Sequence, residues 1–254
     1  MLQLTGVSKT YGLGVHALDP TDLSVQPGQV TVLLGPSGAG KSTLLRCMNL
    51  LVKPTTGTVR ADGLPELDSR RALRRHRRQT GMVFQHHQLL LRFTALRNVL
   101  LGRVGYHGLL RGLWPAGRAE ERIALEALDQ VGLFDKALAR ADTLSGGERQ
   151  RVGIARALAQ QPRLILADEP VASLDPGTAR RVLALLRSVC EHNGITLVAS
   201  LHQVDLALEH ADRIIGLAHG EIVYDGPPAE VSSSVLQLIY EGTTSDAPIP
   251  TAID

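Results

Sequence analysis

The sequence lacks the features of a secreted or membrane-spanning chain. Its 254 residues include no run of about 18 uncharged apolar residues, the length that a transmembrane helix needs. Met1–Thr5 does not open a basic segment followed by a long apolar one, so we expect no secretory signal. Cysteine is also scarce: Cys47 and Cys190 form no CxxC pair and are expected to be reduced, buried thiols. Any passage through a membrane is therefore expected to belong to another chain.

The sequence also has almost no excess of charge of either sign. There are 27 Lys and Arg against 25 Asp and Glu, a net charge of +2. A net charge this close to zero argues against a strongly basic nucleic-acid-binding protein, and no nucleic-acid partner is expected. Only four of the 27 basic residues are lysine, so the position of each lysine carries information. The composition, 44% apolar and 20% charged, is otherwise that of a globular α/β or α+β protein.

Alternating strand and helix patterns enclose a helical middle section. Residues 1–85 and 160–235 contain short apolar strand candidates, most of them followed by a helical pattern. Residues 86–159 mostly place Leu and Ala at three- and four-residue spacing, which is typical of helices. The pattern predicts one α/β domain over residues 1–235 with an inserted helical subdomain, followed by a C-terminal tail over residues 236–254. Within this tail, Thr243–Asp254 has little to bury and is expected to be loose.

Gly35–Ser42 has the spacing of a phosphate-binding loop, G-x4-G-K-[ST]. An apolar strand candidate, Val30–Leu34, precedes the loop and a helical pattern follows it. Glycines let backbone N–H groups turn toward phosphates, and the following helix adds about half a positive charge. Lys41 is expected to reach the β- and γ-phosphates, and the Ser42 hydroxyl to bind Mg²⁺. The expected nucleotide-binding set is Gly35, Pro36, Ser37, Gly38, Ala39, Gly40, Lys41, Ser42 and Thr43.

Two adjacent acids end another apolar strand candidate. Leu164–Ala167 runs directly into Asp168 and Glu169. Ligands of a parallel α/β sheet bind at the carboxyl ends of its strands. Asp168 is therefore expected to face Mg²⁺, and Glu169 to act as general base on a water that attacks the γ-phosphate. Alone, such a pair would more often begin a loop; the phosphate loop favours the catalytic interpretation.

A second glycine-rich segment, Leu144–Gln150, also precedes a helical pattern. Ser145 suits a helix cap, and Gly146 and Gly147 allow a close backbone approach. Because one nucleotide needs only one phosphate loop, a second anion site predicts contact with a nucleotide held by another copy. At this motif the sequence resembles the ATP-binding cassette (ABC) ATPases of membrane transporters, over about residues 1–235. Five motifs occur in the family's order, the other four being the phosphate loop, Gln85, Asp168–Glu169 and His202.

The resemblance implies a fold and an assembly. The fold is a P-loop NTPase (RecA-like) α/β core with an N-terminal antiparallel β subdomain and an inserted helical subdomain. The assembly is a rotationally symmetric dimer that holds two ATP molecules, with Mg²⁺, between its subunits. ATP binding would close the dimer, and hydrolysis followed by release would reopen it.

The resemblance also implies roles near the γ-phosphate. Gln85 would sense Mg²⁺ and the attacking water and link to the membrane subunit. His202 would contact the γ-phosphate and orient Glu169. Tyr11 would stack on adenine, although it could instead be a core tyrosine at a strand end. The implied catalytic set is Glu169, His202 and Gln85, and the implied metal set is Ser42, Gln85 and Asp168.

Other implied roles belong to the dimer interface. Ser145, Gly146 and Gly147 would clamp the partner's ATP, and Asp175 would cross the interface. Glu148 stands where the family more often has Gln, and a small effect is expected.

Longer stretches narrow the resemblance to the ATPase subunit of phosphonate importers, a group that includes phosphite relatives. They are Asn98–Arg103, Ala167–Pro176, Ser200–Leu208 and Ala211–Ile215. The implied partners are transmembrane permease subunits and, indirectly, a periplasmic solute-binding protein. The implied location is peripheral, at the cytoplasmic face of the inner membrane. Because such an ATPase does not touch the solute, no residue here specifies the solute physically.

Other transporter classes and other cassette proteins remain as alternatives. The core motifs alone would also suit an amino-acid-type importer or a lipid or lipoprotein exporter. DNA-repair and chromosome-organising relatives carry long coiled coils after Gln85, whereas only 58 residues separate Gln85 from Leu144 here, with no sustained heptads. Translation-type relatives carry two cassettes in one chain, and this sequence has a single set of motifs.

Two segments keep open interpretations. The basic run Arg70–Arg78 predicts either a solvated helix face or a contact with anionic lipid headgroups or acidic permease loops. The insert over residues 102–118 is expected near the membrane subunit. Its Trp114 is either an interface anchor or a core residue.

Overall fold

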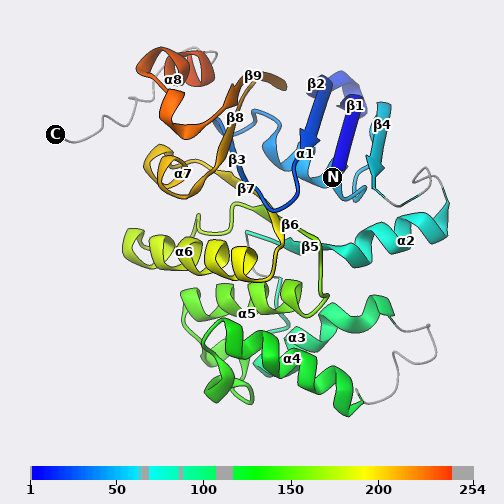
Figure 1. Cartoon of the computed structure of the whole chain (residues 1–254), viewed down its shortest axis with the longest axis vertical. Helices are drawn as coiled ribbons and strands as arrows, with labels where there is room; N and C mark the ends of the chain where they lie inside the picture. The colour runs from blue at the N-terminus through cyan, green and yellow to red at the C-terminus, as the bar shows by residue number, and fades with distance from the viewer. Residues whose placement is uncertain (1, 63, 65–68, 86–87, 107–116, 242–254) are drawn as a thin grey trace.

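The computed structural model is shown in Figure 1. It describes residues 2–62, 64, 69–85, 88–106 and 117–241. Trp114 and most of the insert in which it stands lie outside the described residues.

A six-stranded sheet forms the centre of the molecule. Five neighbouring strands are parallel, and the edge strand β9 pairs antiparallel with β8 in a hairpin that turns at His219 and Gly220. In sheet order the strands are β5 (Thr80–Val83), β6 (Leu164–Asp168), β7 (Thr196–Leu201), β3 (Val30–Leu34), β8 (Arg213–Ala218) and β9 (Glu221–Gly226).

The central strands are apolar throughout because both faces of the sheet are covered. On β3, Val30, Val32 and Leu34 enter one core cluster, while Leu33 enters the other. Helix α1 (Lys41–Met48) lies on the Leu33 side. The opposite face is covered by helices α5 (Gly146–Leu158), α6 (Pro176–His192) and α7 (Val204–His210), as Figure 1 shows.

A separate antiparallel sheet forms the expected N-terminal β subdomain. Its order is β2 (Val15–Val25), β1 (Leu2–Tyr11) and β4 (Thr56–Ala61). Leu4 and Val7 of β1 are buried in the same core cluster as α1, so this sheet and the central sheet enclose that helix. The α/β architecture with an antiparallel β subdomain is thus confirmed.

The middle section of the chain is helical, as expected. Its helices α3 (Ala95–Leu100), α4 (Arg118–Gln130) and α5 pack on one another and below the central sheet in Figure 1. The basic run forms helix α2 (Arg70–Gln79), capped by Ser69. Short 3₁₀ turns are η1 (Gly12–Gly14), η2 (Leu101–Tyr106), η4 (Phe134–Lys136), η5 (Ala141–Thr143) and η6 (Pro228–Glu230).

The predicted domain boundary at residue 235 must be corrected. Helix α8 (Ser233–Tyr240) crosses it and packs against β8 and β9. Ile239 is fully buried in the main core cluster, over Gly216 of β8. A Cβ on Gly216 would lie 2.5 Å from the Ile239 Cδ1 atom, so glycine makes room for this helix. The domain therefore extends at least to Tyr240, and the first residues of the predicted C-terminal tail are helical. The segment expected to be loose, Thr243–Asp254, lies outside the described residues.

No helix in the described part of the chain is both long enough and apolar enough to cross a bilayer.

Candidate nucleotide site

The phosphate loop turns sharply between β3 and α1, at two glycines. Gly35 has a φ of 155°, and a Cβ there would lie 2.2 Å from the Leu217 carbonyl oxygen. Gly40 has a φ of 102°, and a Cβ there would lie 2.6 Å from the Ala17 carbonyl oxygen. Both positions require glycine because of backbone conformation and space. The loop therefore enters α1 with the N-terminal amides of that helix free to meet an anion.

Lys41 is the first residue of α1 and lies inside the loop. Its ammonium donates hydrogen bonds to the carbonyl oxygens of Gly35 (2.6 Å) and Pro36 (2.8 Å). Burial lowers the pKa of Lys41 from 10.5 to about 8, against the opposing effect of the nearby carboxylates of Glu169 and Asp168. The cation is thus partly desolvated and held where the loop would wrap a phosphate.

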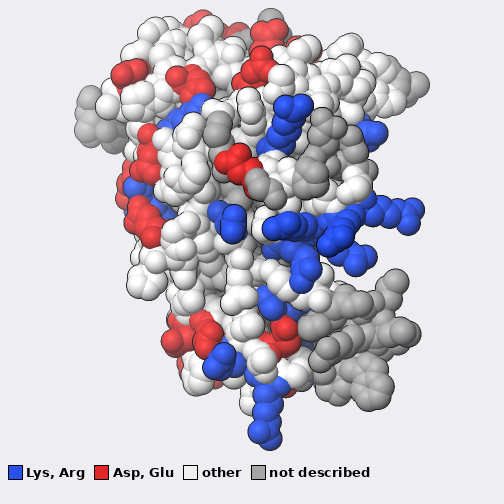
Figure 2. Space-filling view, turned by 45° about the vertical axis from the view of Figure 1, so that its right-hand side comes forward, with Lys and Arg blue, Asp and Glu red and all other residues white. Residues whose placement is uncertain are grey.

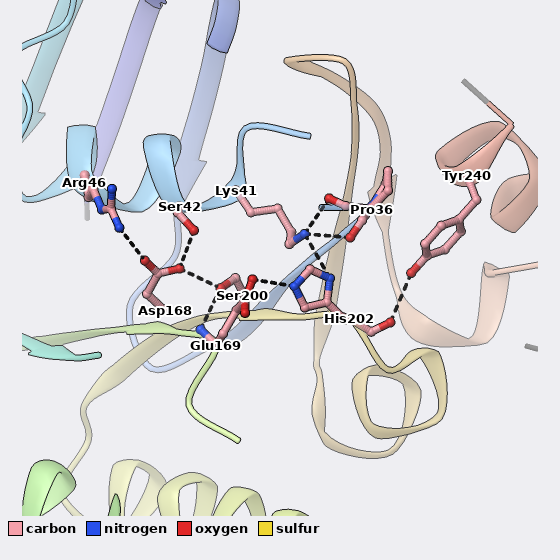
Figure 3. A network of polar contacts seen from close by, with 10 residues as sticks. Pro36, Lys41, Ser42, Arg46, Asp168, Glu169, Ser200, His202 and Tyr240 are labelled. Atoms are coloured by element: carbon pink, nitrogen blue, oxygen red, sulfur yellow. Dashed lines mark hydrogen bonds and ion pairs between the residues drawn. The ribbon is translucent and has the colours of Figure 1, made fainter. Parts of the chain in front are cut away.

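The two acids point in different directions, as Figure 3 shows. Asp168, the last residue of β6, is buried and accepts hydrogen bonds from the hydroxyls of Ser42 (2.7 Å) and Ser200 (3.2 Å). The guanidinium of Arg46 lies 3.5 Å from its other oxygen. Glu169 follows with a φ of 48°, a left-handed conformation that non-glycine residues adopt at a cost.

This left-handed turn aims Glu169 at His202. The Glu169 N–H donates to the Ser200 hydroxyl at 2.9 Å, which fixes the turn. Its carboxylate forms a hydrogen bond with His202 Nε2, and His202 Nδ1 lies 3.4 Å from the Lys41 ammonium. The sheet thus brings Lys41, Ser42, Asp168, Glu169 and His202 together in one network (Figure 3).

The donor set fits Mg²⁺. Ser42 and Asp168 present oxygen atoms, the ligand type that Mg²⁺ prefers beside phosphate groups. No group of three or more His, Cys, Asp or Glu side chains suited to a metal occurs among the described residues. Such a site would take its remaining ligands from the nucleotide and from water, as is usual for Mg²⁺.

The glycine-rich segment at 144–150 caps α5, as expected for Ser145. The Ser145 hydroxyl accepts from the Glu148 N–H (3.3 Å), and the Ser145 N–H donates back to the Glu148 carboxylate (2.8 Å). Lys136, another of the four lysines, forms an ion pair with Glu148. The Lys136 hydrogen bond, followed by that from Ser145, lowers the pKa of Glu148 from 4.5 to about 2. Glu148 therefore stays ionised and fixes the shape of this segment.

The same segment packs against the start of α6. Asp175 caps that helix by accepting from the Thr178 N–H at 2.9 Å. A Cβ on Gly147 would lie 2.7 Å from the Thr178 methyl group, and one on Gly146 would lie 3.4 Å from Leu174. Ser145 and Asp175 thus lie on two segments that contact each other, and Lys136 pairs with the first of them through Glu148.

Gln85 and Tyr11 lie at strand ends. Gln85 stands two residues beyond β5, which pairs with β6 so that Val83 is opposite Ala167, directly before Asp168. Tyr11 is the last residue of β1, is 39% exposed, and has the Lys9 ammonium 5.1 Å from its ring centroid. Its ring is therefore open to a stacking partner rather than buried in the core.

Sequence reasoning missed three residues of this network. Ser200 lies opposite Asp168 in the register of β6 and β7 and contacts both acids. Ser200 opens one of the stretches that carry the resemblance, but as a site residue it was marked only by being polar at the end of an apolar strand. Arg46 lies one helical turn after Ser42, and Tyr240 donates to the His202 carbonyl from α8. Neither had a motif to mark it.

Comparison with known proteins agrees with this geometry. The family model described as ABC transporter matches residues 18–172. The chain belongs to the ABC transporter family. It is an ABC ATPase, with the P-loop NTPase fold that the sequence motifs indicated.

Similar proteins cover nearly the whole chain. A phosphite import ATP-binding protein of Stutzerimonas stutzeri is 56% identical, over 98% of this chain and 90% of its own length. A phosphonates import ATP-binding protein of Nostoc sp. is 55% identical, over 94% of this chain and 92% of its own length. A solved ATP-binding cassette, dimeric and bound to ADP and Pi in a post-hydrolysis state, is 37% identical with a TM-score of 0.78, over 90% of this chain and 99% of its own.

Proposed function

We propose that this chain is the ATP-binding and ATP-hydrolysing subunit of an importer for phosphonate, phosphite or a related phosphorus oxyanion. The observation that carries the solute class is the identity of 55–56%, over at least 94% of this chain, to a phosphonate and a phosphite import ATP-binding protein. The two relatives are almost equally similar to this chain, so the proposal includes both solutes.

In the proposed mechanism the phosphate loop binds the triphosphate. The backbone amides of the loop and of α1 contact the phosphates, and the Lys41 ammonium exchanges its loop carbonyl partners for β- and γ-phosphate oxygens. Ser42 and Asp168 would hold Mg²⁺, with Gln85 near it. This ion supplies charge neutralisation on the phosphates. Tyr11 would stack on the adenine.

Glu169 would then act as general base. The carboxylate takes a proton from a water as that water attacks the γ-phosphate in line with the leaving ADP oxygen. His202 keeps Glu169 oriented through their hydrogen bond and stands next to Lys41, where it would meet the γ-phosphate. The products are ADP and phosphate.

The proposal includes a symmetric ATP sandwich. Ser145, Gly146 and Gly147 of one copy would bind the γ-phosphate held by the other, and Asp175 would cross the interface. The support is that these residues lie on segments that contact each other, and that no hydrogen bond or ion pair among the described residues joins them to the phosphate loop of their own chain. Solved ATP-binding cassettes with 37% identity are dimeric, which supports a dimer of this chain as well.

A basic groove supports a partner at the membrane. It has a volume of about 480 Å³ and lies between α2 and η2. Figure 2 shows basic side chains gathered in a band where α2 lies. The α2 residues that line the groove repeat at helical spacing: Arg70, Leu73, Arg74, Arg77 and Arg78.

Part of this groove is held rigid. The Arg78 guanidinium lies 4.0 Å from the ring centroid of Tyr106, and Arg103 lies 3.9 Å from the same ring. The Tyr106 hydroxyl donates to the Gln160 carbonyl at 2.6 Å. An ordered, arginine-lined groove is complementary to an acidic segment of a permease subunit. We place the permease contact there, with a periplasmic solute-binding protein acting on the far side and the chain peripheral at the inner membrane.

Uptake of phosphorus compounds tests the proposed function. A bacterial host without its own phosphonate ATPase would carry the matching permease and binding-protein genes with either the wild-type chain or Glu169→Gln. Wild type should restore uptake of methylphosphonate or phosphite, and the variant should not, because import needs ATP hydrolysis. The proposal would be overturned if Glu169→Gln restored uptake of each compound as well as the wild type does, or if the wild type restored uptake of neither.

A further inference from the structure

His202 is held on two sides. On its imidazole side it bonds Glu169 and lies near the Lys41 ammonium. On its backbone side, its carbonyl oxygen accepts a hydrogen bond from the Tyr240 hydroxyl at 3.3 Å (Figure 3). His202 itself lies in the short link between the end of β7 and the start of α7, where neither element fixes its peptide. The Tyr240 contact therefore restrains the one segment that carries this imidazole.

Tyr240 comes from a firmly docked helix. α8 begins at a Ser232 cap, whose hydroxyl accepts from the Val235 N–H at 3.3 Å. Near its other end, Ile239 is fully buried above Gly216 in the main core cluster. Tyr240 follows Ile239 directly, so the depth of the Ile239 side chain sets the position of the tyrosine.

The hydroxyl of Tyr240 is a permanent donor. Burial raises the pKa of Tyr240 to about 12, so the group stays protonated at any pH at which the enzyme would work. A hydroxyl that stays protonated can keep donating to a carbonyl oxygen, which has no proton of its own to give.

We propose that Tyr240 is a positioning residue for ATP hydrolysis: its hydrogen bond to the His202 carbonyl holds the imidazole where it can hydrogen-bond to Glu169. In this role Tyr240 acts through the peptide of His202 and not on the reacting atoms. α8 thereby becomes part of the hydrolytic machinery although it lies far along the sequence from every nucleotide-binding motif. The inference rests on the proposed ATPase mechanism and adds a residue to it.

The test is Tyr240→Phe in the full chain. Loss of this one neutral hydrogen bond should lower kcat for ATP hydrolysis by about two- to tenfold. KM for ATP should stay within about twofold, because the phosphate loop and Tyr11 are unchanged. Thermal unfolding should shift little, since Ile239 keeps α8 in place. In a His202→Ala background the same substitution should have no further effect on residual turnover.

Tyr224→Phe is the matched control. It removes a hydroxyl that donates to the Pro227 carbonyl at 2.8 Å, on the β9 strand against which α8 packs. This variant should keep wild-type kcat. If Tyr240→Phe also keeps wild-type kcat, or loses only stability, the positioning role is wrong.

Failure of this inference is distinguishable from failure of the proposed function. Wild-type chain that hydrolyses ATP, together with inactive Glu169→Gln, upholds the mechanism whatever Tyr240→Phe does. Only an active mechanism combined with an unaffected kcat in Tyr240→Phe overturns the inference alone. A wild-type chain without ATPase activity overturns both.

Discussion

At the scale of single residues, the site depends on where a few charges are placed. Asp168 and Glu169 are neighbours in the chain, yet the left-handed φ of Glu169 turns one toward Ser42 and the other toward His202. Two adjacent carboxylates can thus serve two purposes, metal binding and proton abstraction. The backbone strain at Glu169 is compensated by the Ser200 hydroxyl, which bonds both residues.

Lys41 makes ATP binding depend on pH. Its pKa of about 8 means that the ammonium loses its proton as pH rises through this value, whereas a lysine in the unfolded chain keeps it to 10.5. Because only the charged form attracts phosphate strongly, ATP affinity should fall about tenfold between about pH 7 and pH 9. Fluorescent-nucleotide displacement across this range measures the effect.

Lys41→Arg is the control for that prediction. An arginine stays protonated throughout this range, so the variant should bind more weakly but with no comparable loss as pH rises. An affinity of the wild-type chain that does not change between these pH values would contradict the assignment of Lys41 to phosphate binding.

At the scale of elements, the sequence predicted best where a motif and its strand lie together. The β3–loop–α1 unit and the β6–Asp168–Glu169 strand end could be predicted because an apolar strand buried on both faces has a short, continuous signature. Helix α8 could not be predicted as part of the domain. It is eight residues long, and its docking depends on a missing side chain at Gly216 on another strand.

The docking of α2 is tested by charge reversal on one face of this helix. Arg70→Glu with Arg74→Glu should reduce recovery of the chain with membranes by several-fold when the permease is co-expressed, because both residues line the groove. Arg71→Glu with Arg75→Glu makes the same charge change on the same helix, outside the groove lining, and should have little effect.

Recovery of the chain with membranes distinguishes the two partners that the basic helix α2 could bind, an acidic permease segment or lipid headgroups. Recovery that needs the permease supports an acidic permease segment, whereas equal recovery on anionic vesicles alone would show that lipid headgroups suffice. Unchanged recovery of the groove variant with the permease present would rule out docking at this groove.

At the scale of the whole molecule, we propose that each chain carries two half-sites. One is the phosphate loop with its acids and His202; the other is the surface formed by Ser145, Gly147 and Asp175. The sequence indicated both, because one nucleotide does not need two glycine-rich loops. It could not predict that Lys136 and Glu148 fix the second half-site. This ion pair connects the η4 turn to the capped start of α5, and no motif links these two elements.

We propose that this chain hydrolyses ATP bound between two copies, with Glu169 as the base. The most direct measurement is ATP turnover and oligomeric state of Glu169→Gln, compared with Glu126→Gln, which changes an exposed glutamate of α4. We expect Glu169→Gln to lose at least about a hundredfold in kcat, to keep ATP affinity, and to form a stable dimer in ATP. Glu126→Gln should match the wild type. Hydrolysis by Glu169→Gln at the wild-type rate would contradict the account.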